Sequence, residues 1–112
     1  MRIEELRAED LLVLGGLARL MLRSDGDFSE DEEAAINRIG EAEGNERALW
    51  KPISDSAQAY PTDAEVRAVV GQVSSPDARA RILSILETIA EADGVDSAET
   101  ELLDWLREQW KP

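Results

Sequence analysis

The chain has 112 residues, of which 25 are acidic and 12 basic, so its formal net charge is −13. It contains neither cysteine nor histidine. This excludes disulfides, thiolate catalysis, iron–sulfur clusters and cysteine-ligated zinc, and it removes the commonest general base. The negative charge argues against nucleic acids and anionic membranes as partners, because both repel such a chain.

A chain of this length forms one domain, residues 1–112, and its 43% hydrophobic residues suffice for a core. The longest apolar stretch, residues 11–22, is too short to cross a bilayer, which takes about 20 apolar residues. Acidic residues precede this stretch where a signal peptide would be positively charged. We therefore expect a cytoplasmic protein of bacterial type that does not insert into membranes.

Helices are the only regular structure that the sequence predicts, because apolar residues recur at helical spacing and alternating β-branched runs are missing. The expected helices cover residues 9–24, 29–44, 45–50 with an extension to about 60, 62–73, 75–90 and 97–110. Residues 51–62, which contain Pro52, have the least certain conformation, since proline either breaks or restarts a helix.

Three helix starts carry specific capping signals. Capping boxes of the form Ser/Thr-x-x-Glu run from Ser29 to Glu32 and from Thr62 to Glu65. Ser75 is followed by a proline, which is favoured at the first helical position. These signals predict where the second, fourth and fifth helices begin.

An internal repeat organises the chain. Residues 22–26 and 90–94 both end an apolar helix with Asp-Gly, and a capped acidic helix follows each. The cap and its partner are Ser29 and Glu32 in the first copy, and Asp96 and Glu99 in the second, whose loop is one residue shorter. The sequence therefore predicts an all-α fold: a compact orthogonal bundle of about six helices, built from two pseudo-symmetric helix–loop–helix repeats that bury each other's apolar faces.

Side-chain directions along these helices single out four carboxylates. An α-helix turns about 100° per residue, so the direction of each side chain follows from its position. The carboxylates that project toward the apolar faces near the two loops are Asp25, Glu32, Asp93 and Glu99. Those that point to water are Glu30, Asp31, Glu33 and Glu101. We predict that the four inward carboxylates gather at one end of the bundle.

Inward carboxylates need partners, because burying an unpaired carboxylate costs several kcal/mol. One alternative is backbone N–H groups at the helix starts and in the loops. The other is a divalent cation, Ca²⁺ or Mg²⁺, which prefers oxygen ligands. An ordinary EF-hand is not expected, because its first two ligand positions would be Met21 and Arg23.

Residues 23–32 and 91–99 resemble the two repeats of the tellurite-resistance TerB-like helical domain family, and the resemblance extends from about residue 10 to residue 110. It implies an all-α bundle, a place in a bacterial stress or defence system, and an acidic cluster that engages a divalent metal. Carried over to this sequence, the cluster would comprise Asp25, Glu32, Asp93 and Glu99. The first copy has Ser24 where alanine is usual in the family.

The expected function is non-enzymatic. Ser54, Ser56 and Ser74 have no nearby base, and a compact bundle of this size leaves little room for a substrate cleft. One hypothesis is a metal-binding interaction module of the TerB-like type. The alternative is an acidic domain that docks on a basic protein surface or mimics nucleic acid, without a functional metal. The residues expected to contact a partner are Glu30, Asp31, Glu33 and Trp105.

Overall fold

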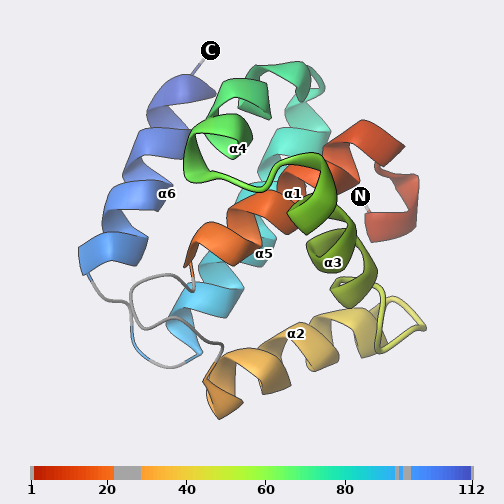
Figure 1. The fold of residues 1–112 in the computed structure, drawn as a ribbon. Coiled ribbons are helices and arrows are strands. Elements are labelled where there is room, and N and C mark those ends of the chain that lie inside the picture. Colours follow the sequence, from red (N-terminus) through yellow and green to blue (C-terminus); the bar gives the residue numbers. More distant parts are fainter. Residues whose placement is uncertain (1, 22–28, 93, 95–96, 112) are drawn as a thin grey trace.

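Six α-helices and two short 3₁₀ turns make up the part of the chain that the computed structural model describes: residues 2–21, 29–92, 94 and 97–111 (Figure 1). In chain order the elements are η1 (Ile3–Glu5), α1 (Ala8–Met21), α2 (Glu30–Ala42), α3 (Trp50–Ala59), α4 (Asp63–Val69), η2 (Val70–Gln72), α5 (Pro76–Glu91) and α6 (Ser97–Gln109). These residues contain no strand, so the prediction of an all-α bundle is confirmed.

Helix α1 forms the centre of the bundle and contacts α3, α4, α5 and α6 (Figure 1). Every residue from Val13 to Ala18 is buried, because neighbouring helices surround this part of α1. The two adjacent glycines let those neighbours approach closely. A Cβ atom on Gly15 would lie 2.2 Å from the carbonyl oxygen of Pro52, and one on Gly16 would lie 3.0 Å from Cγ2 of Val66. The glycine pair therefore marks two helix crossings.

The remaining helices bury the faces that the periodicity predicts. Along α5 the buried stripe comprises Ile82, Ile85, Leu86, Ile89 and Ala90. Along α6 it comprises Leu102, Leu103, Leu106 and, just beyond the helix end, Trp110. Helix α2 packs against α5, whereas α6 packs against both α5 and α1. Helix α5 thus contacts α1, α2 and α6.

The segment between α2 and α3 differs from the predicted short helix. Gly44, with φ +88°, follows the end of α2, and residues 46–49 form turns rather than helix. The side-chain oxygen of Asn45 accepts a hydrogen bond from the N–H of Arg47 at 3.0 Å, so it caps a turn. Helix α3 starts at Trp50 and places Pro52 in its first turn, where a missing N–H costs no intrahelical bond.

The fourth helix is shorter than predicted. It ends at Val69 and tightens into the 3₁₀ turn η2, consistent with the low helix propensity of Gly71. The carbonyl oxygen of Val70 accepts a hydrogen bond from Nε1 of Trp110 at 2.9 Å. This hydrogen bond connects η2 to Trp110, the residue that follows α6.

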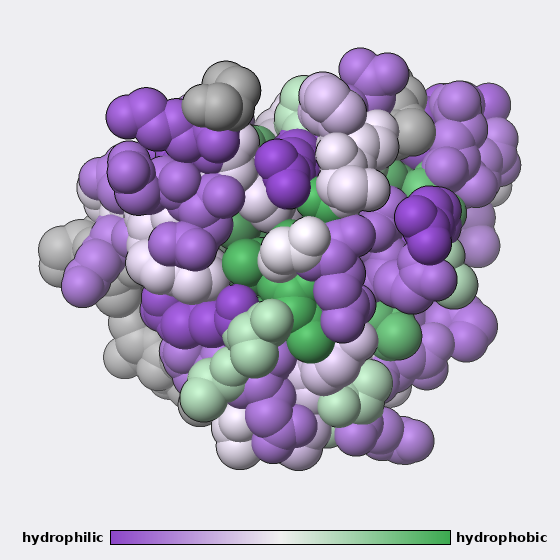
Figure 2. Space-filling model, turned by 90° about the horizontal axis from the view of Figure 1, so that it is seen from above, coloured by the Kyte–Doolittle hydropathy of each residue, from purple (hydrophilic) through white to green (hydrophobic). Residues whose placement is uncertain are grey.

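Figure 2 shows one face of the molecule, on which hydrophilic residues predominate. Seen from above, hydrophobic residues show mainly in a central area with hydrophilic ones around it (Figure 2). Within the described ranges, none of the helices combines the length and the hydropathy that crossing a membrane requires.

Candidate functional site

Glu32 lies in the first turn of α2 and is only 4% exposed. Its Oε1 accepts a hydrogen bond from the backbone N–H of Ser29 at 3.0 Å. In return, the N–H of Glu32 donates to Oγ of Ser29 at 3.1 Å. The predicted capping box is therefore confirmed, and one oxygen of this carboxylate already has a backbone partner.

Glu99 occupies the corresponding position in the first turn of α6 and is 6% exposed. Asp25, Asp93 and the predicted cap Asp96 lie outside the described residues, so the four-carboxylate cluster stays a prediction. Within the described ranges no three acidic side chains are grouped closely enough to hold a metal ion. The ends of α1 and α5 and the starts of α2 and α6 all lie toward the lower left of Figure 1, as a shared cluster would require.

The outward side of α2 carries the acidic residues predicted to contact a partner. Glu30, Asp31 and Glu33, in the first turn of α2, are exposed. Glu41, in the last turn of the same helix, is exposed as well. We call these four residues the α2 acidic face. None of them forms an ion pair with a described residue. Arg38 is exposed on the same side of α2 and interrupts the negative charge.

Glu43 lies two residues after Glu41, but it does not belong to the α2 acidic face because its side chain is largely covered. Its side chain is 9% exposed, and its Oε1 accepts a hydrogen bond from the backbone N–H of Ile3. Nε of Arg2 lies 3.4 Å from Oε2, and a terminal nitrogen of Arg81 lies 3.7 Å from Oε1. The hydrogen bond from Ile3, helped by the two arginines and opposed by burial, lowers the pKa of Glu43.

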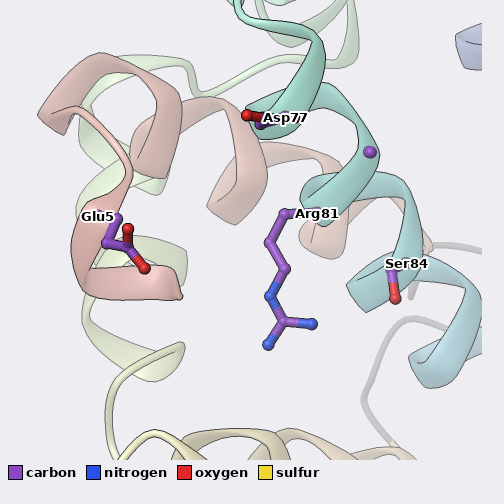
Figure 3. Close-up of a pocket in the computed structure, with 5 residues that line it drawn as sticks. Glu5, Asp77, Arg81 and Ser84 are labelled. Carbon is purple, nitrogen blue, oxygen red and sulfur yellow. The ribbon is translucent and has the colours of Figure 1, made fainter. Parts of the chain in front are cut away.

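Beside this ion-pair group lies an open cleft of about 580 Å³ between the N-terminal turn and α5. Figure 3 shows Arg81 extending into the opening, with Glu5 across from it and Asp77 and Ser84 on the same helix as Arg81. Nε of Arg81 is buried and has no hydrogen-bond partner among the described residues. Ser84 is exposed and, within the part of the chain that the structure describes, no carboxylate is bonded to it to activate it as a nucleophile.

Asp10 is a further buried carboxylate, outside the four that were predicted to point inward. It lies in the first turn of α1, is 3% exposed, and its Oδ1 accepts no hydrogen bond from any described residue. Burial raises the pKa of Asp10, Arg7 opposes this, and Glu9 adds to it. The signal was its spacing: Asp10 lies four residues before Leu14, on the buried stripe of the helix.

Trp105, the predicted aromatic contact for a partner, is partly buried against the core. The guanidinium of Arg67 lies over its ring, 4.6 Å from the centroid. Arg67 is itself held by Asp63, with Nε 2.5 Å from Oδ1. One face of the indole is therefore already occupied by a cation.

Comparison with protein-family models, with curated proteins and with solved structures gave no match to this chain.

Proposed function

We propose that this chain is a non-enzymatic interaction domain that binds a basic partner protein through the α2 acidic face, in a bacterial stress or defence system of the kind that the TerB-like resemblance implies. The observation that supports this is the absence of ion pairs from Glu30, Asp31, Glu33 and Glu41 to any described residue, although all four are exposed. Their charge is thus available to a partner.

The opposite side of α2 gives this face a rigid base. Ala35 and Ile36 are buried, and the capping box at Ser29 fixes the start of the helix. Carboxylates held on a rigid helix present a fixed pattern of charge, which steers a basic partner during diffusion and raises its association rate. The Debye length is about 8 Å at physiological ionic strength, so affinity should fall steeply with added salt.

The test uses a short fluorescein-labelled oligolysine peptide as the probe of a basic partner. The triple variant E30K/D31K/E33K should weaken binding by at least about tenfold, because the local attraction becomes repulsion. The matched control E4K/E91K/E101K changes the net charge equally, at exposed acids on other elements. Equal losses in the two triple variants would overturn the proposal, because net charge alone would then account for binding.

Divalent metal binding is a second proposed function. The supporting observation is that Glu32 and Glu99 are both buried in the first turns of helices that start on the same side of Figure 1. A carboxylate cluster that includes them would favour Ca²⁺ or Mg²⁺, since both cations prefer oxygen ligands.

The metal proposal is tested by melting the protein with CaCl₂ or MgCl₂ and with chelator. A bound ion should raise the melting temperature with concentration, as the stabilisation RT ln(1 + [L]/Kd) requires. Glu99→Gln should remove this response, whereas Glu101→Gln, on the exposed side of the same helix, should keep it. A response that KCl reproduces at equal ionic strength would rule out a specific site.

A further inference from the structure

A groove lined by apolar and basic residues lies between α5 and the end of α6. Unlike the α2 acidic face, it favours a negatively charged ligand. It encloses about 390 Å³, and its apolar lining comprises Pro76, Ala80, Leu83 and Trp110. The groove is open to solvent rather than closed around a cavity. An open apolar groove between two helices can cover one side of a bound chain segment, as in helix-in-groove recognition.

The polar residues of this groove are all basic. Arg79, Arg107 and Lys111 line it, and none of the acidic residues that the structure describes does. This is unusual in a chain with 25 acidic and 12 basic residues. Three cations around an apolar floor match a ligand that carries carboxylates beside an apolar side chain.

Arg79 is held in place by the groove itself. Its Nε donates a hydrogen bond to the carbonyl oxygen of Val73 at 2.5 Å, and its guanidinium lies 5.8 Å from the ring centroid of Trp110. Trp110 is fixed in turn by its bond to Val70. Arg79 forms no ion pair with any residue in the described ranges, so its positive charge is available in a fixed orientation.

The other two cations have only surface partners. Arg107 pairs with Glu87 at 2.7 Å and with Asp104 at 3.1 Å, and its side chain is 45% exposed. Nζ of Lys111 lies 3.9 Å from Oε2 of Glu108, and both side chains are mostly exposed. Exposed ion pairs are worth at most about 1 kcal/mol, so an incoming carboxylate can replace these partners.

We infer that this groove docks an acidic segment of another protein, with an apolar side chain seated between Leu83 and Trp110 and flanking carboxylates on Arg79 and Lys111. The inference is independent of the α2 acidic face, which takes a ligand of opposite charge. The domain would then have two surfaces that select different partners by charge.

The probe is a short fluorescein-labelled peptide with a central Leu-Trp pair flanked by glutamates, measured by fluorescence anisotropy. Lys111→Glu should weaken its binding by about tenfold, as expected when an attractive charge contact becomes repulsive. Lys51→Glu is the matched control: it makes the same charge change at an exposed site on α3, and it should leave binding within about twofold. Leu83→Ser should also weaken binding, because it removes the apolar contact.

Two further peptides and one small molecule decide the ligand class. Replacing the glutamates by glutamines should weaken binding about tenfold, and replacing them by lysines should abolish it. Equal effects of Lys111→Glu and Lys51→Glu would overturn the inference, since net charge would then explain the result. Octanoate that binds the groove while the acidic peptide does not would also overturn it, because the ligand would then be a free apolar carboxylate.

Discussion

Gly15 of α1 faces the backbone of Pro52 in α3 so closely that a Cβ atom on Gly15 would lie 2.2 Å from the carbonyl oxygen and 2.4 Å from the carbonyl carbon of Pro52. The obstacle is backbone, which cannot rotate away as the end of a side chain can. Helices α1 and α3 form the most extensive helix pair in the bundle. Helix α1 can therefore pack this closely against α3 only because Gly15 has no side chain.

Gly15→Ala should destabilise the protein by about 3 kcal/mol or more, since overpacking forces the two helices apart. Urea unfolding followed by circular dichroism measures this change. Gly71→Ala is the control, because no atom of the described residues lies within 4 Å of a Cβ there; it should change stability by no more than about 0.5 kcal/mol. If Gly15→Ala changed stability as little as Gly71→Ala, the close approach of α1 to α3 at Gly15 would be contradicted.

A second prediction concerns Glu43, whose carboxylate joins the N-terminal turn to α2 and α5. Glu43→Gln should cost about 1–3 kcal/mol at neutral pH, because it removes the ion pairs to Arg2 and Arg81 and leaves only a neutral oxygen to accept the hydrogen bond from Ile3. The lowered pKa of Glu43 means that the unfolded chain takes up the proton first as pH falls. The stabilisation is therefore full above the unfolded value of 4.5 and is lost as pH falls through the lower folded value.

Denaturant unfolding of wild type and Glu43→Gln across this pH range checks the prediction. The two stabilities should converge as the pH drops below 4.5. Glu41→Gln, two residues away and exposed, should follow wild type at every pH. A constant gap between wild type and Glu43→Gln would mean that the charge of Glu43 contributes nothing.

The helix starts could be predicted from the sequence because capping is local. Ser29, Thr62 and Ser75 each accept a hydrogen bond from the backbone three residues later, so all the necessary atoms lie within one turn. Periodicity likewise predicted that Glu32 and Glu99 point inward, because side-chain direction follows from position on the same helix. These parts of the fold and of the candidate site depend on short-range geometry.

Contacts between distant segments could not be predicted in this way. Glu43 meets Ile3 across 40 residues of sequence, and the basic groove exists only because the end of α6 lies beside the start of α5. Periodicity tells which way a side chain points from its own helix, but not what lies opposite. The surroundings of Asp10 escaped prediction for the same reason, although its spacing from Leu14 placed it on the buried stripe.

A third prediction follows from the burial of Asp10. Burial holds the pKa of this carboxyl in the folded protein above its ordinary value of 3.8, so the native state binds the proton more tightly than the unfolded chain. Asp10 therefore lowers stability once the pH rises above the folded pKa, and this cost disappears below 3.8. Asp10→Asn should raise the melting temperature at pH ~7, and the gain should shrink toward acid pH.

Thermal melts of wild type and Asp10→Asn at several pH values measure this effect. Glu9→Asn, at the neighbouring exposed position, serves as the control and should not stabilise the protein. A loss of stability in Asp10→Asn at neutral pH would show that the charge is favoured by the start of α1, where the helix dipole attracts anions.

The last prediction separates the capping role of Glu32 from a metal-binding role. As a cap, Glu32 needs only an oxygen that accepts the N–H of Ser29, and a glutamine side chain keeps such an acceptor. In the presence of chelator, Glu32→Gln should therefore cost less than about 0.5 kcal/mol, whereas Glu32→Ala should cost about 1 kcal/mol, as lost caps do.

With Ca²⁺ or Mg²⁺ in excess, the two variants should compare differently. If Glu32 also binds metal, glutamine should behave like alanine, because both remove the negative charge that holds the cation. Urea unfolding of the three proteins with and without metal distinguishes the roles: equal ranking under both conditions assigns Glu32 to the cap alone and removes it from any metal cluster.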